Sequence, residues 1–259
     1  MLAHEKFNRP LAFRWLGEFL ERLQGRYHAG PDMGVTAEDL AYVRSATAYI
    51  AHGYGGPTDY GEWTALGVFH ALTAAVEHRA GEPAPWPELR VVVQGLGQVG
   101  WSICRRLWEV GAQLVVTDID AERVRRARET FGAGVVQPDE ILFCDADVLV
   151  PCAAGQIIDP AAAAALRCWL VCGSANGILT HPDVALLLHE RGILMVPDIL
   201  SSAGAVIAGA LRFFKQADDE SIAGEVGKIA TRTRHILAQA SETGQPPLWV
   251  ALDRVARRL

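Results

Sequence analysis

The sequence contains no apolar run approaching the roughly 18 residues of a membrane-spanning helix, and its first residues lack the apolar core of a signal peptide. It also contains no block rich in lysine and arginine, and its formal net charge is -6. A surface with that charge balance is poorly suited to neutralising the phosphates of a nucleic acid. We therefore expect small-molecule partners, no binding to nucleic acid or membrane, and a cytoplasmic location.

Paired cysteines are also missing, because the five cysteines include no C-x-x-C pair and lie in apolar segments. An odd number of cysteines in such segments argues against a disulfide framework and against a zinc site. We interpret them as buried thiols and expect no bound metal, with a reactive role for Cys152 as the alternative. The five residues are Cys104, Cys144, Cys152, Cys168 and Cys172.

What the sequence does contain is the composition of a globular protein, with 259 residues, 50% of them hydrophobic and 21% charged. The first third predicts helices. One is indicated by the helical spacing of Leu11, Trp15, Phe19 and Leu23, another by the capped start at residues 36–39, and a third runs from about residue 63 to 78. Residues 81–87, rich in glycine and proline, predict a linker.

Beyond the linker, short β-branched runs alternate with helical stretches, a pattern typical of a parallel sheet covered on both faces. The expected fold class is therefore α/β, with a doubly wound Rossmann domain at residues 81–209, a helical part at 1–80 and C-terminal helices at 210–259. A break is expected near residues 244–247. The expected strands lie near residues 91–93, 114–116, 135–136, 148–150, 170–171 and 193–196.

A glycine-rich turn follows the first expected strand and opens a helix. Its spacing is G-x-G-x-x-G, in which Gly95 makes the tight turn, Gly97 lets the backbone approach a diphosphate, and Gly100 lets helix and strand pack closely. The second strand ends at Asp118, whose carboxylate can accept hydrogen bonds from ribose hydroxyls. This arrangement predicts NAD as the cofactor, because a carboxylate repels the 2′-phosphate of NADP. The nearby Arg123 and Arg125 keep NADP from being excluded.

With these residues placed, the chain from about residue 13 resembles the glutamate/leucine/phenylalanine/valine dehydrogenase family, most closely its leucine and phenylalanine branch. Enzymes of that family reversibly convert an amino acid to a 2-oxo acid and ammonia and pass hydride to a nicotinamide. The likeness rests on residues 25–27, 31–34, 64–68, 95–100, 116–120, 151–153, 173–176, 197–198 and 202–204.

The resemblance implies a role for individual residues. Asp32 matches the catalytic carboxylate that moves protons to and from the amine, Thr64 matches a residue beside the nicotinamide amide, and Asn176 matches an asparagine at the nicotinamide ribose. A plain turn aspartate is the alternative for Asp32. Ser202 and Val206 match the wall of the substrate pocket, where smaller side chains than usual leave room for a different substrate. The remaining expected cofactor contacts are Gln98, Val99, Ile119, Cys152, Ala153 and Ala154.

Lysine is the main departure from the family. Its complete enzymes have a longer N-terminal domain that supplies a catalytic lysine and a second lysine for the substrate carboxylate. Here the only lysines are Lys6, Lys215 and Lys228, and we interpret Lys6 as a solvated side chain. Losing such a general base costs on the order of 10² to 10⁴ in rate, so the resemblance leaves ordinary deamination in doubt.

Other acids and bases in the N-terminal part could replace the lysine, although a packing or surface role is the more common one for each. His52 and Tyr60 are of most interest, because their glycine-rich loop directly precedes Thr64. The full set is His28, His52, Tyr54, Asp59, Tyr60 and His70.

Three functions remain open at this point. The first is an NAD-dependent oxidoreductase acting on an amine, imine or 2-oxo acid. The second is a catalytically incomplete NAD-binding subunit or regulatory protein whose partner chain supplies the missing half of the site. The third, a Rossmann protein of one-carbon or shikimate metabolism, fits less well with Asp32, Thr64 and Asn176 together. The resemblance implies a homo-oligomer, and the second function implies a hetero-oligomer.

Overall fold

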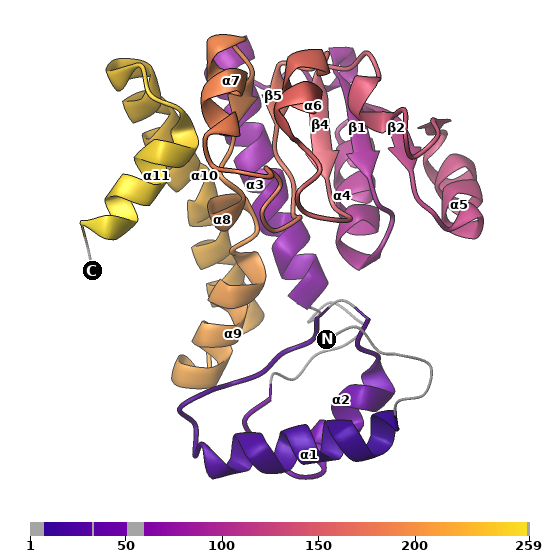
Figure 1. Cartoon of the computed structure of the whole chain (residues 1–259), viewed down its shortest axis with the longest axis vertical. Coiled ribbons are helices and arrows are strands. Elements are labelled where there is room, and N and C mark those ends of the chain that lie inside the picture. Colours follow the sequence, from indigo (N-terminus) through magenta and orange to yellow (C-terminus); the bar gives the residue numbers. More distant parts are fainter. Residues whose placement is uncertain (1–7, 33, 51–59, 258–259) are drawn as a thin grey trace. The chain divides into compact units, whose positions relative to one another are not determined.

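The computed structural model describes residues 8–32, 34–50 and 60–257, which form two compact units (Figure 1). The N-terminal unit contains the residues up to Tyr60 together with residues 209–216, and the sheet unit contains residues 61–208 and 217–259. By compactness, residues 61–80 therefore group with the sheet. The division into domains at residues 80 and 209 stays a prediction.

The N-terminal unit is built on helices α1 (Arg9–Arg22) and α2 (Ala37–Arg44). The side chain of Asn8 caps α1 by accepting a hydrogen bond from the Leu11 amide at 3.2 Å. Thr36 and Asp39 form a complete capping box at the start of α2, as the sequence predicted. The apolar core of the unit consists of Phe13, Leu20, Leu40, Val43 and Ile50.

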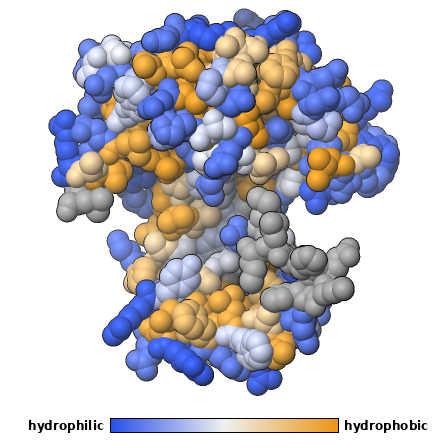
Figure 2. Space-filling view, in the orientation of Figure 1, coloured by the Kyte–Doolittle hydropathy of each residue, from blue (hydrophilic) through white to orange (hydrophobic). Residues whose placement is uncertain are grey.

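The spacing of apolar residues predicted α1 correctly but does not mark its buried face. Leu11, Trp15 and Phe19 are 42%, 60% and 58% exposed, whereas Phe13 and Leu20 are buried. Apolar residues accordingly reach the surface over α1 (Figure 2). A helix with apolar residues on two faces satisfies the same spacing rule on both, so periodicity alone could not choose between them.

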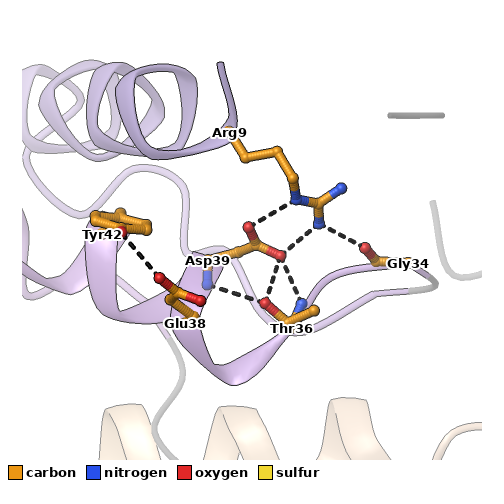
Figure 3. Close-up of polar contacts among 6 residues, drawn as sticks. All are labelled: Arg9, Gly34, Thr36, Glu38, Asp39 and Tyr42. Atoms are coloured by element: carbon orange, nitrogen blue, oxygen red, sulfur yellow. Dashed lines mark hydrogen bonds and ion pairs between the residues drawn. The ribbon is translucent and has the colours of Figure 1, made fainter. Parts of the chain in front are cut away.

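An ion pair fastens α1 to the start of α2 (Figure 3). Arg9 donates from Nε to one Asp39 oxygen at 3.0 Å and from Nη2 to the other at 2.5 Å, and the side chain of Asp39 is only 4% exposed. The Thr36 amide donates to the same carboxylate at 2.7 Å, and Arg9 also donates to the Gly34 carbonyl at 2.8 Å. These hydrogen bonds, chiefly from Arg9, lower the pKa of Asp39 to about 2 against the opposing effect of burial.

The sheet unit alternates strands and helices. Its strands are β1 (Arg90–Gln94), β2 (Gln113–Thr117), β3 (Gly134–Val135), β4 (Val148–Pro151), β5 (Leu170–Val171) and β6 (Leu194–Met195). Its α-helices are α3 (Tyr60–Ala80), α4 (Gln98–Glu109), α5 (Ala121–Phe131), α6 (Pro160–Ala165), α7 (Val184–Glu190), α8 (Asp198–Ser201), α9 (Gly204–Lys215), α10 (Asp219–Thr243) and α11 (Pro247–Ala256). Tyr60 at the start of α3 and residues 209–215 of α9 count with the N-terminal unit. The 3₁₀ helices are η1 (Trp86–Glu88) and η2 (Ile141–Phe143).

The six strands pair in the order β3-β2-β1-β4-β5-β6, and every pair is parallel (Figure 1). All six lie where β-branched runs predicted them, and the break between α10 and α11 falls at residues 244–246 as expected. From β1 the chain adds β2 and β3 on one side and then returns to place β4 on the other. The order in which strands are added therefore reverses between β1 and β4, the point where ligands bind in open α/β sheets.

The strands are apolar at successive positions because both faces of the sheet are buried. Val92, Leu149 and Val171 lie in one cluster with residues of α6 and α7, which cover that face of the sheet. On β1 and β4 every residue from Val91 to Val93 and from Val148 to Pro151 is buried. Within the described part of the chain, no helix is long and apolar enough to cross a membrane.

We expect Asp39→Asn to destabilise the N-terminal unit by roughly 1–3 kcal/mol at pH 7, because it leaves Arg9 and the Thr36 amide with a weaker acceptor. The pKa of Asp39 is lowered in the fold from 3.8 to about 2, so its contribution is present above about pH 4 and is lost as the pH falls through 2. Hydrogen exchange of the α1 and α2 amides tests this when the full chain and the Asp39→Asn variant are compared at pH 7 and near pH 2.

Glu38→Gln is the matched control, since Glu38 is exposed and accepts a hydrogen bond from the Tyr42 hydroxyl at 3.0 Å. It should change the stability of the same helices by less than about 0.5 kcal/mol. Equal effects of the two substitutions would contradict the role given to Asp39.

Candidate functional site

The turn after β1 can be made only by glycine. Gly95 has φ of +93°, and its amide donates to the Thr117 carbonyl at the end of β2, at 2.8 Å. A Cβ at Gly95 would lie 2.8 Å from the Cβ of Ala153, which belongs to the loop after β4. Both backbone conformation and space therefore require glycine where the sequence predicted the tight turn.

The start of α4 leaves room for an anion. Gly97 is the N-cap of this helix. Among the described residues no side chain caps it, and a Cβ there would meet nothing closer than Arg123 Nη1 at 3.9 Å. A Cβ at Gly100, in contrast, would stand 1.9 Å from the Gly95 carbonyl oxygen. The first turn of a helix directs backbone N–H groups toward its N-terminal end, so the start of α4 suits the diphosphate of a dinucleotide. Gln98 and Val99 belong to that first turn.

Asp118 stands beside this turn with its carboxylate already oriented. One of its oxygens accepts from the Leu96 amide at 2.6 Å and the other from the Asp120 amide at 2.8 Å, and the side chain is 7% exposed. Each carboxylate oxygen has two lone pairs, so both can accept a further hydrogen bond from a ribose hydroxyl. Ile119, the next predicted contact, is exposed.

One of the two arginines near Asp118 in the sequence also lies near it in the structure. Arg123 Nη1 lies 3.9 Å from Asp118, and its Nε lies 3.3 Å from Asp120. Arg125 instead pairs with Glu122 and Glu129 on the surface of α5, at 2.5 Å to each. Of the two arginines singled out in the sequence, Arg123 is therefore the one that lies beside Asp118.

The loops after β4 and β5 meet at the same edge. The Cys152 amide donates to the Gln94 carbonyl at 2.7 Å, and the exposed residues Ala153 and Ala154 follow it. A Cβ at Gly155 would lie 2.1 Å from the backbone oxygen of Asn176, whose side chain is at the surface. The structure therefore brings together the loops that carry these predicted residues, and their contacts with a cofactor stay predictions.

The thiols are poorly suited to nucleophilic chemistry. Burial raises the pKa of Cys152 and of Cys168 to about 11, and it raises the pKa of Cys104 and Cys172 well above that of a free thiol. Cys104, Cys168 and Cys172 are buried as expected, whereas Cys144 and Cys152 are only half-buried. No group of three or more potential metal ligands occurs among the described residues.

The predicted nicotinamide and substrate residues of the sheet unit lie on adjoining segments. A Cβ at Gly204, the start of α9, would lie 1.9 Å from the Trp63 carbonyl oxygen and 3.1 Å from the Cα of Thr64. Ser202 stands just before that contact, and its hydroxyl donates to the Asp198 carbonyl at 2.7 Å. Val206, one turn further, is 75% exposed.

Asp32 lies in the N-terminal unit, exposed, in the turn that precedes α2. Its carbonyl accepts a hydrogen bond from the Val35 amide at 3.0 Å, and Arg9 holds the neighbouring Gly34 carbonyl. The ion pair with Asp39 therefore anchors the loop that carries the predicted catalytic carboxylate. The sequence placed Asp32 in a loop correctly, and its catalytic role stays a prediction.

The other acid and base candidates divide into packed residues and residues outside the described ranges. The His28 ring packs 3.5 Å from the Phe213 ring, centroid to centroid, and the buried Tyr60 ring lies 5.9 Å from the Arg212 guanidinium. Burial lowers the pKa of His70, and the charge of Arg106 lowers it further. His52, Tyr54 and Asp59 lie outside the described residues.

Sequence reasoning missed two carboxylates that organise the site. Asp198 is buried at the start of α8 and accepts a hydrogen bond from the Gly177 amide at 2.5 Å, which ties the loop after β5 to α8. Its signal was an acidic residue directly after the last strand. Glu62, in the first turn of α3, contacts α4, and nothing in the local pattern pointed to it.

Comparison with known proteins agrees with this geometry. A family model described as Glutamate/Leucine/Phenylalanine/Valine dehydrogenase matches residues 116–252. Leucine dehydrogenase from Thermoactinomyces intermedius is 34% identical over 250 residues, which cover 94% of this chain and 67% of that protein. L-tryptophan dehydrogenase from Nostoc punctiforme is 34% identical over 250 residues, which cover 95% of this chain and 68% of that protein.

Solved structures show the same fold. A crystal structure of L-tryptophan dehydrogenase from Nostoc punctiforme matches with a TM-score of 0.78 at 31% identity, covering 98% of this chain and 74% of that one. A hetero-hexameric glutamate dehydrogenase from Thermus thermophilus matches in fold, with a TM-score of 0.73 at 23% identity, covering 96% of this chain and 68% of that one. The chain thus spans about two thirds of the length of the leucine dehydrogenase that it matches.

Two glycine substitutions should separate cofactor binding from folding. Gly97→Ala has room for its Cβ, so we expect it to cost at most about 1 kcal/mol of stability while weakening NADH binding on the order of tenfold. Gly100→Ala places its Cβ on the Gly95 carbonyl, so it should destabilise the fold by more than about 3 kcal/mol.

Thermal unfolding and titration of NADH fluorescence measure the two effects. The assignment of Gly97 fails if its alanine variant binds NADH as tightly as the wild type. If the Gly100→Ala variant is as stable as the wild type, the claim that the contact at Gly100 leaves no room for a Cβ is contradicted.

Proposed function

The chain belongs to the glutamate/leucine/phenylalanine/valine dehydrogenase family, and we propose from that premise that it transfers hydride between a nicotinamide and an amine, imine or 2-oxo acid. It is an NAD-dependent oxidoreductase that acts on CH-NH2 or C=N groups. The observation that carries this proposal is the edge formed by β1 and β2, where the open first turn of α4 stands beside the oriented carboxylate of Asp118. Small molecules are its substrates, and a cytoplasmic location and an oligomeric state stay predictions.

NAD supplies the hydride acceptor or donor when it is bound, and the protein supplies position. The amides of the first turn of α4 hold the diphosphate, and Asp118 receives the ribose hydroxyls. Asn176, on the loop after β5, binds the ribose of the nicotinamide half. Thr64, the fifth residue of α3, holds its carboxamide, and the exposed residues Ala153 and Ala154 line the loop after β4 against which the cofactor lies.

Asp32 moves protons at the substrate nitrogen. It is exposed at the surface of its unit, so its carboxyl group is accessible to solvent protons, and the Arg9 anchor keeps its loop in place. Ser202 and Val206 contact the substrate. Since both are small or aliphatic, they suit an apolar side chain on the substrate better than a charged one.

A second function is favoured by one observation in the sequence, the absence of lysine between residues 7 and 214. In this family a lysine of lowered pKa is the base that activates water, and residues 7–214 offer no candidate for it. Such a chain would bind NAD and need a partner chain to supply the lysines. Reduction of a preformed imine requires no activated water, so it remains open to the chain acting alone.

The absorbance of NADH, followed with the purified chain, tests the function. One panel contains 2-oxo acids with ammonia, and the other contains cyclic imines. Turnover in either panel would exclude the incomplete-subunit alternative. Tight NADH binding without any turnover would support that alternative, and a well-folded chain that binds neither NADH nor NADPH would overturn both.

In an active panel, we expect Asp32→Asn to lower turnover by about 10² to 10⁴ while leaving the dissociation constant of NADH unchanged, because only proton transfer is lost. Turnover equal to that of the wild type would remove the role given to Asp32.

Replacing Asp118 should change the choice of coenzyme. Asp118→Ser removes a charged acceptor for the ribose hydroxyls, an interaction of about 1.5–3 kcal/mol, and so should weaken NADH binding about ten- to hundredfold. It also removes the repulsion of a 2′-phosphate and leaves Arg123 beside it, so NADPH should gain relative to NADH. Asp120→Ser is the control, because serine can still cap α5 and the carboxylate at Asp118 stays. If the ratio of the NADH and NADPH dissociation constants is the same in Asp118→Ser and Asp120→Ser, the role given to Asp118 is contradicted.

A further inference from the structure

The first turn of α3 is tied to α4 through the side chain of Glu62. One carboxylate oxygen accepts a hydrogen bond from the Ser102 hydroxyl at 2.5 Å. The other receives Nη2 of Arg105 at 3.0 Å and Nη2 of Arg106 at 3.4 Å. Three donors from one neighbouring helix therefore converge on a carboxylate that is only 27% exposed.

The same turn of α3 is held from two further directions by backbone packing. A Cβ at Gly61 would lie 2.7 Å from the side chain of Gln98, the first residue of α4. On another side, Gly204 at the start of α9 closes on the Trp63 carbonyl. The turn that contains Thr64 is thus fixed by contacts with α4 and α9, and Glu62 supplies the polar part.

The partner helix is the one whose first turn faces the diphosphate. Ser102, Arg105 and Arg106 lie on the first three turns of α4, which begins at Gln98 beside Gly97. A displacement of α3 relative to α4 would therefore change the spacing between Thr64 and the diphosphate site. Since reacting groups must be held in place closely, a shift of about 1 Å can cost up to about a hundredfold.

We propose that Glu62 is a positioning residue for the nicotinamide half of the coenzyme, acting through the first turn of α3 on Thr64. The inference rests on the proposed function, because the contact between Thr64 and the nicotinamide is part of that proposal. A carboxylate near a helix N-terminus is also favourable by its charge alone. In the described structure, however, the hydrogen-bond and ion-pair partners of Glu62 all lie on α4, so it joins two helices.

Two ligands separate positioning from general stability. NADH reaches both halves of the site, whereas ADP-ribose lacks the nicotinamide and reports on the diphosphate and adenosine half only. We expect Glu62→Gln in the full chain to raise the dissociation constant of NADH about tenfold, and that of ADP-ribose less than twofold. Calorimetry with each ligand measures both constants.

Glu109→Gln is the matched control, because Glu109 also pairs with Arg105, at 3.5 Å, but lies on α4 itself. It should leave both constants within twofold of the wild type. Should Glu62→Gln fold poorly, Ser102→Ala removes one donor to the same carboxylate. It is expected to raise the dissociation constant of NADH about threefold and to leave that of ADP-ribose unchanged.

The outcomes are distinct. Equal weakening of NADH and ADP-ribose by Glu62→Gln, or no weakening of either, overturns the inference. Thr64→Val serves as the reference, since it should weaken the binding of NADH and leave the binding of ADP-ribose unchanged. If Thr64→Val changes neither constant, the Thr64 contact and the role of Glu62 both fall. If the wild-type chain binds neither ligand, the proposed function itself fails.

Discussion

The approach of α4 to the end of β1 is the contact on which the rest of the candidate site depends. The Gly95 carbonyl lies where a Cβ of residue 100 would otherwise stand, so the helix begins directly beside the strand. Because the helix starts there, the amides of its first turn lie at the carboxyl edge of the sheet. The same turn carries Leu96, whose amide orients Asp118, so the diphosphate and ribose halves of the site share one short backbone segment.

The residues predicted to contact the nicotinamide half of the coenzyme come from segments far apart in the sequence. Thr64 comes from a helix that precedes the sheet, and Asn176 comes from a loop after its fifth strand. Glu62 and Asp198 act in similar ways on these two segments, since each uses a carboxylate to bind a neighbouring element. Acidic side chains inside the sheet unit thus hold loops and helices in place, and Asp118 at its edge is itself oriented by two backbone amides.

Local signals in the sequence predicted most of the fold. The β-branched runs identified all six strands, and Thr36 and Asp39 identified the start of α2. The three glycines marked the turn between β1 and α4, and their contacts with a coenzyme, like that of Asp118, stay predictions. The exposed face of α1 was not predictable, because Leu11, Trp15 and Phe19 satisfy helical spacing as well as the buried residues do. Glu62 was missed because its partner Ser102 is 40 residues away and becomes a neighbour only after α3 and α4 pack. Roles carried by single polar contacts between distant segments leave no periodic trace.

The interlocked loops after β4 and β5 have a thermodynamic consequence. Gly173 and Gly155 bring the Pro151 and Asn176 carbonyl oxygens within about 2 Å of where a Cβ would stand, so a side chain at either glycine would push the two loops apart. The edge that the two loops form together therefore belongs to the folded chain. Any molecule that recognises only the native state stabilises it by mass action, by about 2.7 kcal/mol at a concentration one hundred times its dissociation constant. The abundance of coenzyme around the chain would then help to set how long it survives unfolding and proteolysis.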